Sequence, residues 1–263
     1  LFSSYHLSPA NLGAYCKKLH TYMPDEIIGY PSSLALVARW MKDNGYKGIF
    51  PKVVFTTAET LLLNQRRVIE QAFNCPVIDQ YGCTEMAMFV AQCRKGNYHV
   101  HPEHGYVEVV DGEGNPVKEG EIGEIVCTGF VNYAMPLIRY RLGDRVRMSR
   151  KECECGLKFP VIEEIIGRVD DAIVTPDGNT VGRLDPVFKG QRNIIQTQII
   201  QEKKDKLVIK IVVDKTFSTN DEKSLMYELR KRVGLKMNIS IEKVQDIPKD
   251  QNGKFRSVIS YLK

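Results

Sequence analysis

The chain has 263 residues, of which 43% are hydrophobic and 26% are charged. That length suggests roughly two domains, and the apolar content is enough for a packed core. The composition therefore excludes a disordered tail, a collagen-like fibre and a disulfide-stapled miniprotein. The 37 Lys and Arg exceed the 32 Asp and Glu by a net charge of only +5, which is too weak to predict nucleic acid as the main partner.

The sequence also indicates in which cellular compartment the protein is found and whether the chain is part of a longer protein. No apolar run reaches the ~18 residues that a membrane span requires, and the N-terminus has no signal-peptide pattern. Seven cysteines at irregular spacing favour reduced thiols over a disulfide framework. We therefore expect a cytoplasmic protein without a membrane span. The chain begins at Leu1 rather than Met, which indicates a processed chain or a fragment of a longer protein.

The first 95 residues predict alternating helices and strands. Helices are expected at 10–19, 32–43 and 60–73, and strands at 52–56 and 77–81. Because a helix joins the two strands, a right-handed crossover should make them parallel. Ligands on parallel sheets bind beyond the carboxyl ends of the strands. The segments 57–59 and 82–85, which follow the two strands, are therefore candidates for a binding site.

Residues 96–167 differ from this pattern. Turn signals separate short β-rich runs such as 106–110 and 124–128, which is typical of an antiparallel meander or a small barrel. Together with residues 1–95, they give the fold class as α/β, with a parallel sheet plus a small antiparallel barrel.

The remaining residues predict a separate, small α+β unit. A hairpin is expected at 194–201 and 206–213, and a strand at 238–244. Between them a helix at 221–233 would be capped by Asn220 and ended by Gly234.

Four short clusters contain residues that could carry chemistry, at 81–85, 140–144, 167–171 and 248–256. They read Tyr-Gly-Cys-Thr-Glu, Tyr-Arg-Leu-Gly-Asp, Gly-Arg-Val-Asp-Asp and Pro-Lys-Asp-Gln-Asn-Gly-Lys-Phe-Arg. Each one alone could be an ordinary turn or hairpin tip, and about one such match in ten would be functional. All four in this order and at these separations are far harder to obtain by chance.

In their order and spacing, these clusters resemble the motifs of the adenylate-forming superfamily of acyl- and aryl-CoA ligases, peptide synthetases and luciferases. The similarity is greatest to the phenylacetate–coenzyme A ligase-like branch, which includes members associated with capsular polysaccharide synthesis. Residues 29–33, 134–141 and 153–156 support the resemblance. It implies that residues 1–167 are the later part of an AMP-binding domain and residues 172–263 a mobile C-terminal domain, joined by a hinge at 168–171.

The resemblance also implies where the adenosine part of ATP or AMP binds. Ala58 and Glu59 would line the adenine slot, and Tyr81, followed by Gly82, would stack on the purine. Asp144 would accept both ribose hydroxyls, since one carboxylate has two acceptor oxygens. Arg168 would support the ribose side.

The phosphate chemistry would fall to other residues. Thr84 would hydrogen-bond the α-phosphate, and Glu85 would hold Mg²⁺, a hard ion that prefers carboxylate oxygens. Lys254 resembles the mobile lysine that meets the α-phosphate and the substrate carboxylate, and Asp170 lies at the hinge. In simpler interpretations, Glu59 and Glu85 are acids at helix N-termini and Lys254 is a solvated hairpin lysine.

The resemblance predicts a ligase reaction: ATP-dependent adenylation of a carboxylic acid, aryl or otherwise apolar, and transfer to coenzyme A. Two alternatives stay open. One is an adenylate-forming enzyme with a non-CoA acceptor in surface-polysaccharide or coenzyme biosynthesis. The other is a catalytically silent scaffold half, because no Ser/Thr/Gly-rich loop is present to cradle the β- and γ-phosphates. The upstream half of the same protein and a second copy in a homodimer are the expected protein partners.

Two further groups of residues are candidates for the acid pocket and for a metal site. Candidates for the acid pocket are Tyr5, His6, Tyr30, Met86 and Phe89, although Met86 and Phe89 fit slightly better as core residues at helical spacing.

A structural zinc site is a second hypothesis. Cys93, His99, Cys153 and Cys155 offer three thiolates and one imidazole, which would suit a closed tetrahedral Zn²⁺ site. His101 is the rival fourth ligand, and a reduced Cys-x-Cys turn without metal is the simpler alternative.

Overall fold

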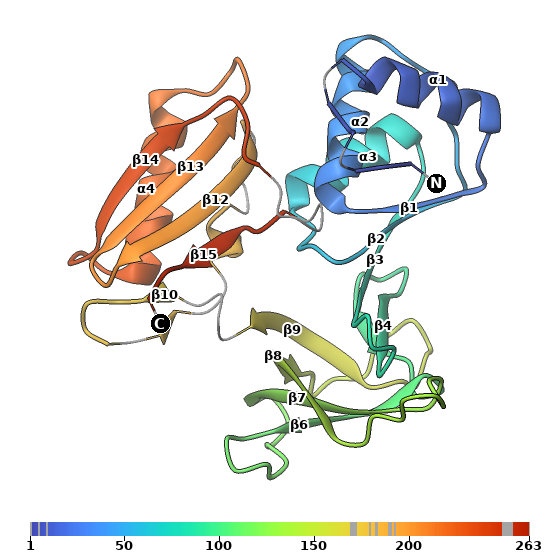
Figure 1. Cartoon of the computed structure of the whole chain (residues 1–263), viewed down its shortest axis with the longest axis vertical. Helices are drawn as coiled ribbons and strands as arrows, with labels where there is room; N and C mark the ends of the chain where they lie inside the picture. The colour runs from blue at the N-terminus through green and yellow to red at the C-terminus, as the bar shows by residue number, and fades with distance from the viewer. Residues whose placement is uncertain are drawn as a thin grey trace. The chain divides into compact units, whose positions relative to one another are not determined.

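The computed structural model describes residues 2–4, 6–8, 10–168, 173–178, 180–181, 184–188, 191, 193–248 and 255–262. The chain divides into two compact units (Figure 1). Unit 1 comprises Leu1–Val77 and Asp170–Lys263, and unit 2 comprises Ile78–Val169.

The N-terminal part of unit 1 contains three helices and two strands. They are α1 (Leu12–Tyr22), β1 (Glu26–Gly29), α2 (Pro31–Asp43), β2 (Val53–Thr56) and α3 (Leu63–Phe73). Strands β1 and β2 are parallel and helix α2 connects them, which makes a βαβ unit. The fully buried side chains of Met41, Ile69 and Phe73 form the centre of its core. The three predicted helices are confirmed, and β1 was not predicted.

The C-terminal part of unit 1 is a four-stranded sheet with a helix on one face (Figure 1). Its elements are β12 (Ile194–Lys203), β13 (Lys206–Val213), α4 (Thr219–Val233), β14 (Asn238–Lys243) and β15 (Val258–Ser260), and the strand order is β14-β13-β12-β15. Leu225 and Leu229 of α4 are fully buried in one cluster with Leu207 and Ile209 of β13. The short β10 (Ile173–Val174), β11 (Thr180–Val181) and the 3₁₀ helix η2 (Asp185–Phe188) precede this sheet.

The predicted cap of helix α4 is wrong. Ser218, and not Asn220, is the N-cap residue. The Ser218 hydroxyl accepts from the Asp221 backbone N–H at 3.4 Å, while the Asp221 carboxylate accepts from the Ser218 backbone N–H at 2.7 Å. This reciprocal capping box satisfies two groups where Asn220 would satisfy one, so the helix begins earlier. Gly234 ends the helix as predicted.

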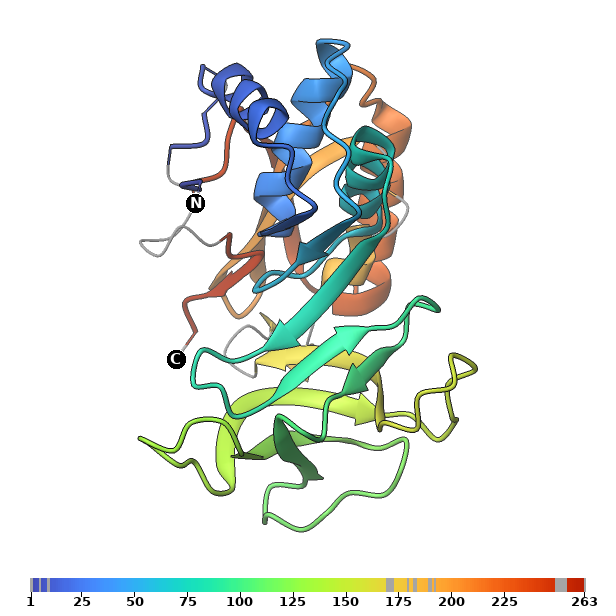
Figure 2. The ribbon, with the colours of Figure 1, turned by 90° about the vertical axis from the view of Figure 1, so that its right-hand side faces the viewer.

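Unit 2 is an antiparallel sheet whose curvature is visible in Figure 2. Its strands are β3 (Val77–Gly82), β4 (Phe89–Gln92), β5 (Tyr98–Val100), β6 (Gly105–Val110), β7 (Ile122–Gly129), β8 (Tyr140–Met148) and β9 (Val161–Arg168). They lie in the order β3-β4-β5-β9-β8-β7-β6, and neighbouring strands are antiparallel. Val90, Ile125 and Val146 are fully buried between them. The α/β fold class is confirmed, and residues 96–167 form antiparallel strands as expected.

Within the described residues, the longest helix is α4, with 15 residues. None of the described helices combines the length and the apolar character that crossing a bilayer requires.

Candidate functional site

The end of strand β3 meets the middle of strand β8 through a hydrogen bond between side chains. The Tyr81 hydroxyl donates to Asp144 Oδ2 at 2.9 Å and joins two residues 63 positions apart in the chain. Burial and the neighbouring Asp144 carboxylate raise the pKa of Tyr81 far above its ordinary value. The phenol therefore stays protonated and continues to donate to Asp144.

A bulge in strand β8 lies between Arg141 and Arg145 and includes Asp144. The register between β7 and β8 shifts between Glu124 and Val126, and Gly143 has a φ of +81°. A side chain at this φ is strained, so glycine suits a bulge here. Across the other edge of β8, Asp144 is the register partner of Arg168. The two predicted ribose-side residues therefore have neighbouring backbones.

A second contact between the same two segments involves Glu85. Residues Cys83 to Met86 form a turn closed by the Met86 N–H donating to the Cys83 carbonyl at 3.1 Å. In this turn Thr84 is exposed and Glu85 is half-buried. The Tyr140 hydroxyl donates to Glu85 Oε1 at 2.9 Å, and this bond to the carboxylate raises the pKa of Tyr140.

This turn contradicts two of the simpler interpretations. Glu85 lies between strands β3 and β4, so it is not the N-terminal acid of a helix. Met86 and Phe89 are not core residues of a helix either. Met86 is 49% exposed at a φ of +60°, and Phe89 begins strand β4. The spacing of Met86 and Phe89 suggested a helix because residues 83–88 contain few residues that mark a turn.

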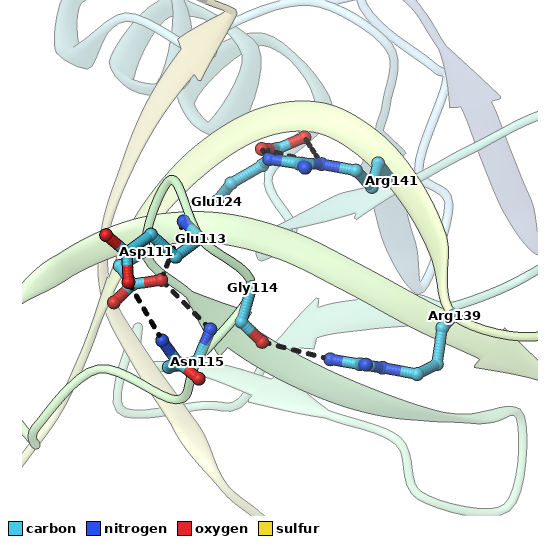
Figure 3. A network of polar contacts seen from close by, with 7 residues as sticks. All are labelled: Asp111, Glu113, Gly114, Asn115, Glu124, Arg139 and Arg141. Atoms are coloured by element: carbon cyan, nitrogen blue, oxygen red, sulfur yellow. Dashed lines mark hydrogen bonds and ion pairs between the residues drawn. The ribbon is translucent and has the colours of Figure 1, made fainter.

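Arg139, which precedes strand β8, and Arg141 within it make polar contacts with neighbouring segments of unit 2 (Figure 3). The Arg139 guanidinium donates to the Gly114 carbonyl at 3.2 Å. Arg141 donates through Nε and Nη2 to the Glu124 carboxylate, and this bond lowers the pKa of Glu124. Because side chains alternate along a strand, the exposed Arg141 and the half-buried Tyr140 point to opposite faces of β8, and Tyr140 meets Glu85.

Ala58 and Glu59 follow strand β2 in unit 1. Ala58 is exposed and has a φ of +65°, an uncommon conformation for a residue with a side chain. The Glu59 carboxylate lies at the N-terminus of helix α2, where it accepts from the Ser32 N–H and the Ser32 hydroxyl, both at 3.0 Å. The interpretation of Glu59 as an acid at the N-terminus of a helix is therefore correct. The helix that it caps is α2 and not the helix that follows Glu59 in the chain.

The four predicted zinc ligands lie together in unit 2. Cys93 follows strand β4, His99 lies on β5, and Cys153 and Cys155 lie in the loop between β8 and β9. One ligand atom from each of the four lies within 4.8 Å of all the others. Cys93 Sγ is 3.7 Å from Cys153 Sγ, and Cys155 Sγ is 3.4 Å from His99 Nε2.

The Cys93–Cys153 and Cys155–His99 distances suit one tetrahedral zinc ion. With Zn–S bonds of ~2.3 Å and Zn–N bonds of ~2.0 Å, tetrahedral geometry requires S···S of about 3.8 Å and S···N of about 3.5 Å. The buried His99 ring donates through Nδ1 to the Phe159 carbonyl at 3.3 Å. This bond leaves Nε2 turned to the sulfurs, as in metal-bound histidines.

The rival ligand His101 is wrong. Its Nδ1 lies 3.2 Å from Glu103 Oε1, and its ring packs against Phe89 and Phe159. His99 and His101 are two positions apart, yet only His99 belongs to the Cys/His cluster.

A pair of thiols borders the Tyr81 and Glu85 contacts and was not predicted. The Cys127 thiol donates a hydrogen bond to Cys83, which lowers the pKa of Cys83 to about 6 and raises that of Cys127. Cys127 is fully buried in β7, and Cys83 is half-buried between Gly82 and Thr84. Sequence reasoning also gave Tyr140 no role, although Tyr140 opens the cluster at 140–144. The alternation of the half-buried Tyr140 with the exposed Arg141 was the available signal.

Three residues named from the sequence lie outside the described residues. They are Lys254, the hinge residue Asp170, and Tyr5 of the candidate acid pocket.

Comparisons with known proteins agree with the motifs. Residues 173–261 match the family model described as the CapK C-terminal domain. The chain is 32% identical over 269 residues to protein CapK of Staphylococcus aureus, which aligns with 100% of this chain and 59% of CapK. It is 24% identical over 228 residues to phenylacetate-coenzyme A ligase of Thermus thermophilus, covering 75% of this chain and 51% of the ligase.

Solved structures with a similar fold include acid–CoA ligases. The solved structure of 2-hydroxyisobutyryl-CoA ligase in complex with R3-HIB-AMP has a TM-score of 0.80 to this chain at 20% identity, covering 97% of this chain and 58% of that one. The chain thus spans between half and two thirds of the length of these proteins.

Fold and motifs together define the class: the chain belongs to the adenylate-forming superfamily. Within it, the chain belongs to the phenylacetate–CoA ligase-like branch, alongside CapK. Its sequence relatives and structural neighbours include acid–CoA ligases.

Proposed function

We propose that the protein containing this chain adenylates a carboxylic acid with ATP and transfers the acyl group to coenzyme A. One observation supports this most directly. Two hydrogen bonds, Tyr81 to Asp144 and Tyr140 to Glu85, bring the motifs at 81–85 and 140–144 together. These are two of the motifs that the superfamily resemblance assigns to one nucleotide. Their convergence in unit 2 needs no further assumption about the rest of the protein.

The oxygen atoms of this cluster suit a nucleoside phosphate. Asp144 can accept from the two ribose hydroxyls, and Tyr81 fixes the orientation of its carboxylate. Glu85 offers a half-buried carboxylate oriented by Tyr140, and carboxylate oxygens are what Mg²⁺ prefers. When bound, Mg²⁺ would neutralise charge on the phosphates. The exposed Thr84 hydroxyl is suited to donate to the α-phosphate.

The proposed reaction has two steps. An oxygen of the substrate carboxylate attacks the α-phosphorus of ATP, and pyrophosphate leaves. The thiol of coenzyme A then attacks the acyl carbon and releases AMP. Lys254 would stabilise the negative charge that develops in the first step, and removing such a charge typically costs about 10²–10³ in rate.

Exchange of labelled pyrophosphate into ATP tests the first step. The full-length protein should catalyse this exchange only with a suitable acid, from a panel of aryl and other apolar carboxylic acids, and without coenzyme A. Lys254→Ala should abolish exchange and largely spare the reaction of supplied acyl-adenylate with coenzyme A. Absence of exchange with every acid would contradict adenylation, and equal loss of both steps would contradict the role of Lys254.

A second candidate keeps adenylation but uses an alcohol or amine as the acceptor. CapK aligns with the whole of this chain, whereas the Thermus thermophilus ligase aligns with 75% of it. Residues 173–261, which would form most of the acceptor-presenting domain, match the CapK C-terminal model. Product analysis with and without coenzyme A separates the two candidates, because only the first forms a thioester.

We further propose that Cys93, His99, Cys153 and Cys155 hold a structural zinc ion. The four ligands close a tetrahedral set, which leaves no position for a substrate. Elemental analysis of the purified protein should find one zinc per chain. Cys93→Ser should lose that zinc, while Cys75→Ser, a matched change outside the cluster, should keep it. A wild-type protein without stoichiometric zinc would contradict the site.

A further inference from the structure

The carboxylate of Asp79 is buried in the middle of strand β3 and has no part in the proposed reaction. Asp79 is 5% exposed, and a buried carboxylate is costly unless hydrogen-bond donors surround it. The Tyr98 hydroxyl of strand β5 donates to Asp79 Oδ2 at 2.5 Å. This bond passes strand β4, which lies between β3 and β5 in the sheet. Asp79 therefore ties β3 to a strand that is not its direct neighbour.

Gln92 of the intervening strand β4 completes a row of three polar side chains. Gln92 Oε1 accepts from the Asp79 backbone N–H at 3.2 Å, and Gln92 is the register partner of Tyr98. All three residues belong to unit 2. The row of Asp79, Gln92 and Tyr98 thus fixes β3 relative to the hairpin that β4 and β5 form.

The turn of this hairpin adjoins two members of the Cys/His cluster. Cys93 directly follows Gln92 in the chain, at the end of β4. His99 directly follows Tyr98 on β5. Within the turn, Gln92 Nε2 donates to the Gly96 carbonyl at 3.1 Å. A metal ion held by all four members of the cluster would tie this turn to the β8–β9 loop, so the hairpin would lose freedom to move.

Tyr81 lies on β3, two positions beyond Asp79. Side chains two positions apart on a strand face the same side, and Tyr81 and Tyr98 pack against the same core cluster. The Tyr81 hydroxyl donates to Asp144, the carboxylate that is expected to accept from the ribose. A shift of β3 against the hairpin would therefore displace Tyr81 and change the orientation of the Asp144 carboxylate.

We propose that the row of Asp79, Gln92 and Tyr98 couples metal binding in the Cys/His cluster to nucleotide binding at Tyr81 and Asp144. The inference rests on the proposed function and on the zinc site proposed with it. An occupied cluster orders the hairpin, the row holds β3 against the hairpin, and Tyr81 keeps Asp144 oriented. Coupling between two sites is reciprocal, so AMP should raise the affinity for Zn²⁺ by the same factor by which Zn²⁺ raises the affinity for AMP.

Replacing Tyr98 with Phe separates the two sites. In the full-length protein, Tyr98→Phe should keep one zinc per chain and weaken AMP binding on the order of 10-fold, a usual size for such coupling. Tyr106→Phe, the same change at an exposed tyrosine of strand β6, is the matched control and should keep both the zinc and the AMP affinity. Titration calorimetry measures the affinity, and elemental analysis measures the zinc. Wild-type AMP affinity in zinc-loaded Tyr98→Phe would overturn the proposal, as would a wild type without zinc.

Two further comparisons show whether the row acts as one connection. Removing zinc from the wild type with a chelator should weaken AMP binding as much as Tyr98→Phe does, and should change the affinity of that variant little. Asp79→Ala removes the acceptor of the same bond, so adding it to Tyr98→Phe should also cause little further loss. Losses that add in full in either comparison would contradict the coupling.

Alkylation of Cys83 tests the coupling without nucleotide or activity. Cys83 directly follows β3, so a less ordered end of this strand should expose its thiol more often. At constant pH, zinc removal from the wild type and Tyr98→Phe with zinc bound should each speed its alkylation several-fold, and Tyr106→Phe should not. A rate independent of zinc would contradict the ordering of β3. If AMP binding depends on zinc as expected but no acid supports pyrophosphate exchange, the proposed function fails and the coupling stands.

Discussion

Two clusters of side chains in unit 2 differ in the atoms that they offer. The first joins β3 to β8 through phenol and carboxylate oxygens, with Glu85 and Asp144 both partly exposed. The second joins the β4–β5 and β8–β9 loops through thiols and the buried ring of His99. Oxygen ligands suit Mg²⁺ and phosphates, whereas thiolates and imidazole suit Zn²⁺. One antiparallel sheet thus carries a cluster of oxygen atoms at one place and a cluster of sulfur and nitrogen atoms at another.

Removing the sulfur cluster should have the largest effect on stability. A structural zinc ion contributes several kcal/mol or more to folding. At roughly 4–8 °C per kcal/mol for a unit of this size, Cys93→Ser with Cys153→Ser should lower Tm by at least 10 °C. Thermal unfolding with and without a chelator measures this. A chelator should lower the wild-type Tm and leave the double variant unchanged. If a chelator left the wild-type Tm unchanged, the sulfur cluster would not hold a structural zinc ion, and the proposed difference between the two clusters would be wrong.

Changes in the oxygen cluster should affect activity rather than stability. Asp144→Asn and Glu85→Gln each remove a charge and keep the shape, so pyrophosphate exchange should fall on the order of 10²-fold. Tm should change little. Glu163→Gln, an exposed change on β9, is the control and should leave exchange unaltered. Wild-type exchange rates in both cluster variants would show that these carboxylates do not take part in the reaction.

The thiol beside the oxygen cluster reports on nucleotide binding. With a pKa of about 6, Cys83 is deprotonated above that pH and protonated below it, so its alkylation rate should reach half its maximum near pH 6. Cys75, whose pKa burial raises, should react slowly at pH 7. Cys127→Ala should move the half-maximum upward, because the donor to the thiolate is lost. ATP with Mg²⁺ should slow alkylation of Cys83, and an unchanged rate would place the nucleotide elsewhere.

The smallest expected effect is a loss of stability when Gly143, in the bulge of strand β8, is replaced. Gly143→Ala places a side chain at a φ of +81°, which costs about 1–2 kcal/mol although no neighbour obstructs the Cβ. Urea unfolding should show this loss. Gly112→Ala is the matched control, since its Cβ also has open space and its φ lies outside the left-handed region. Equal stability of both variants would mean that the bulge does not depend on glycine.

The sequence was enough to name most helices, strands and candidate residues, but it did not predict the contacts between their side chains. Tyr81, Glu85 and Asp144 were each named from their motifs. The bonds from Tyr81 to Asp144 and from Tyr140 to Glu85, however, depend on how strands β3 and β8 meet in the fold. Strand β1 escaped prediction because only two of its four residues, Ile27 and Ile28, are apolar, whereas the equally short β2 begins with three apolar residues in a row. The members of the Cys/His cluster were named in full because cysteine spacing carries chemistry directly, although only the structure separates His99 from His101. Glu59 caps helix α2 from 27 positions away, and no local pattern encodes such a contact.

A crystal structure of the full-length protein with AMP and Mg²⁺ would test the central assignment most directly. We expect the ribose hydroxyls within hydrogen-bond distance of Asp144, and the α-phosphate beside Thr84 and Glu85. AMP bound away from both motifs, with the Tyr81–Asp144 and Tyr140–Glu85 bonds unchanged, would show that these side chains only hold the sheet together.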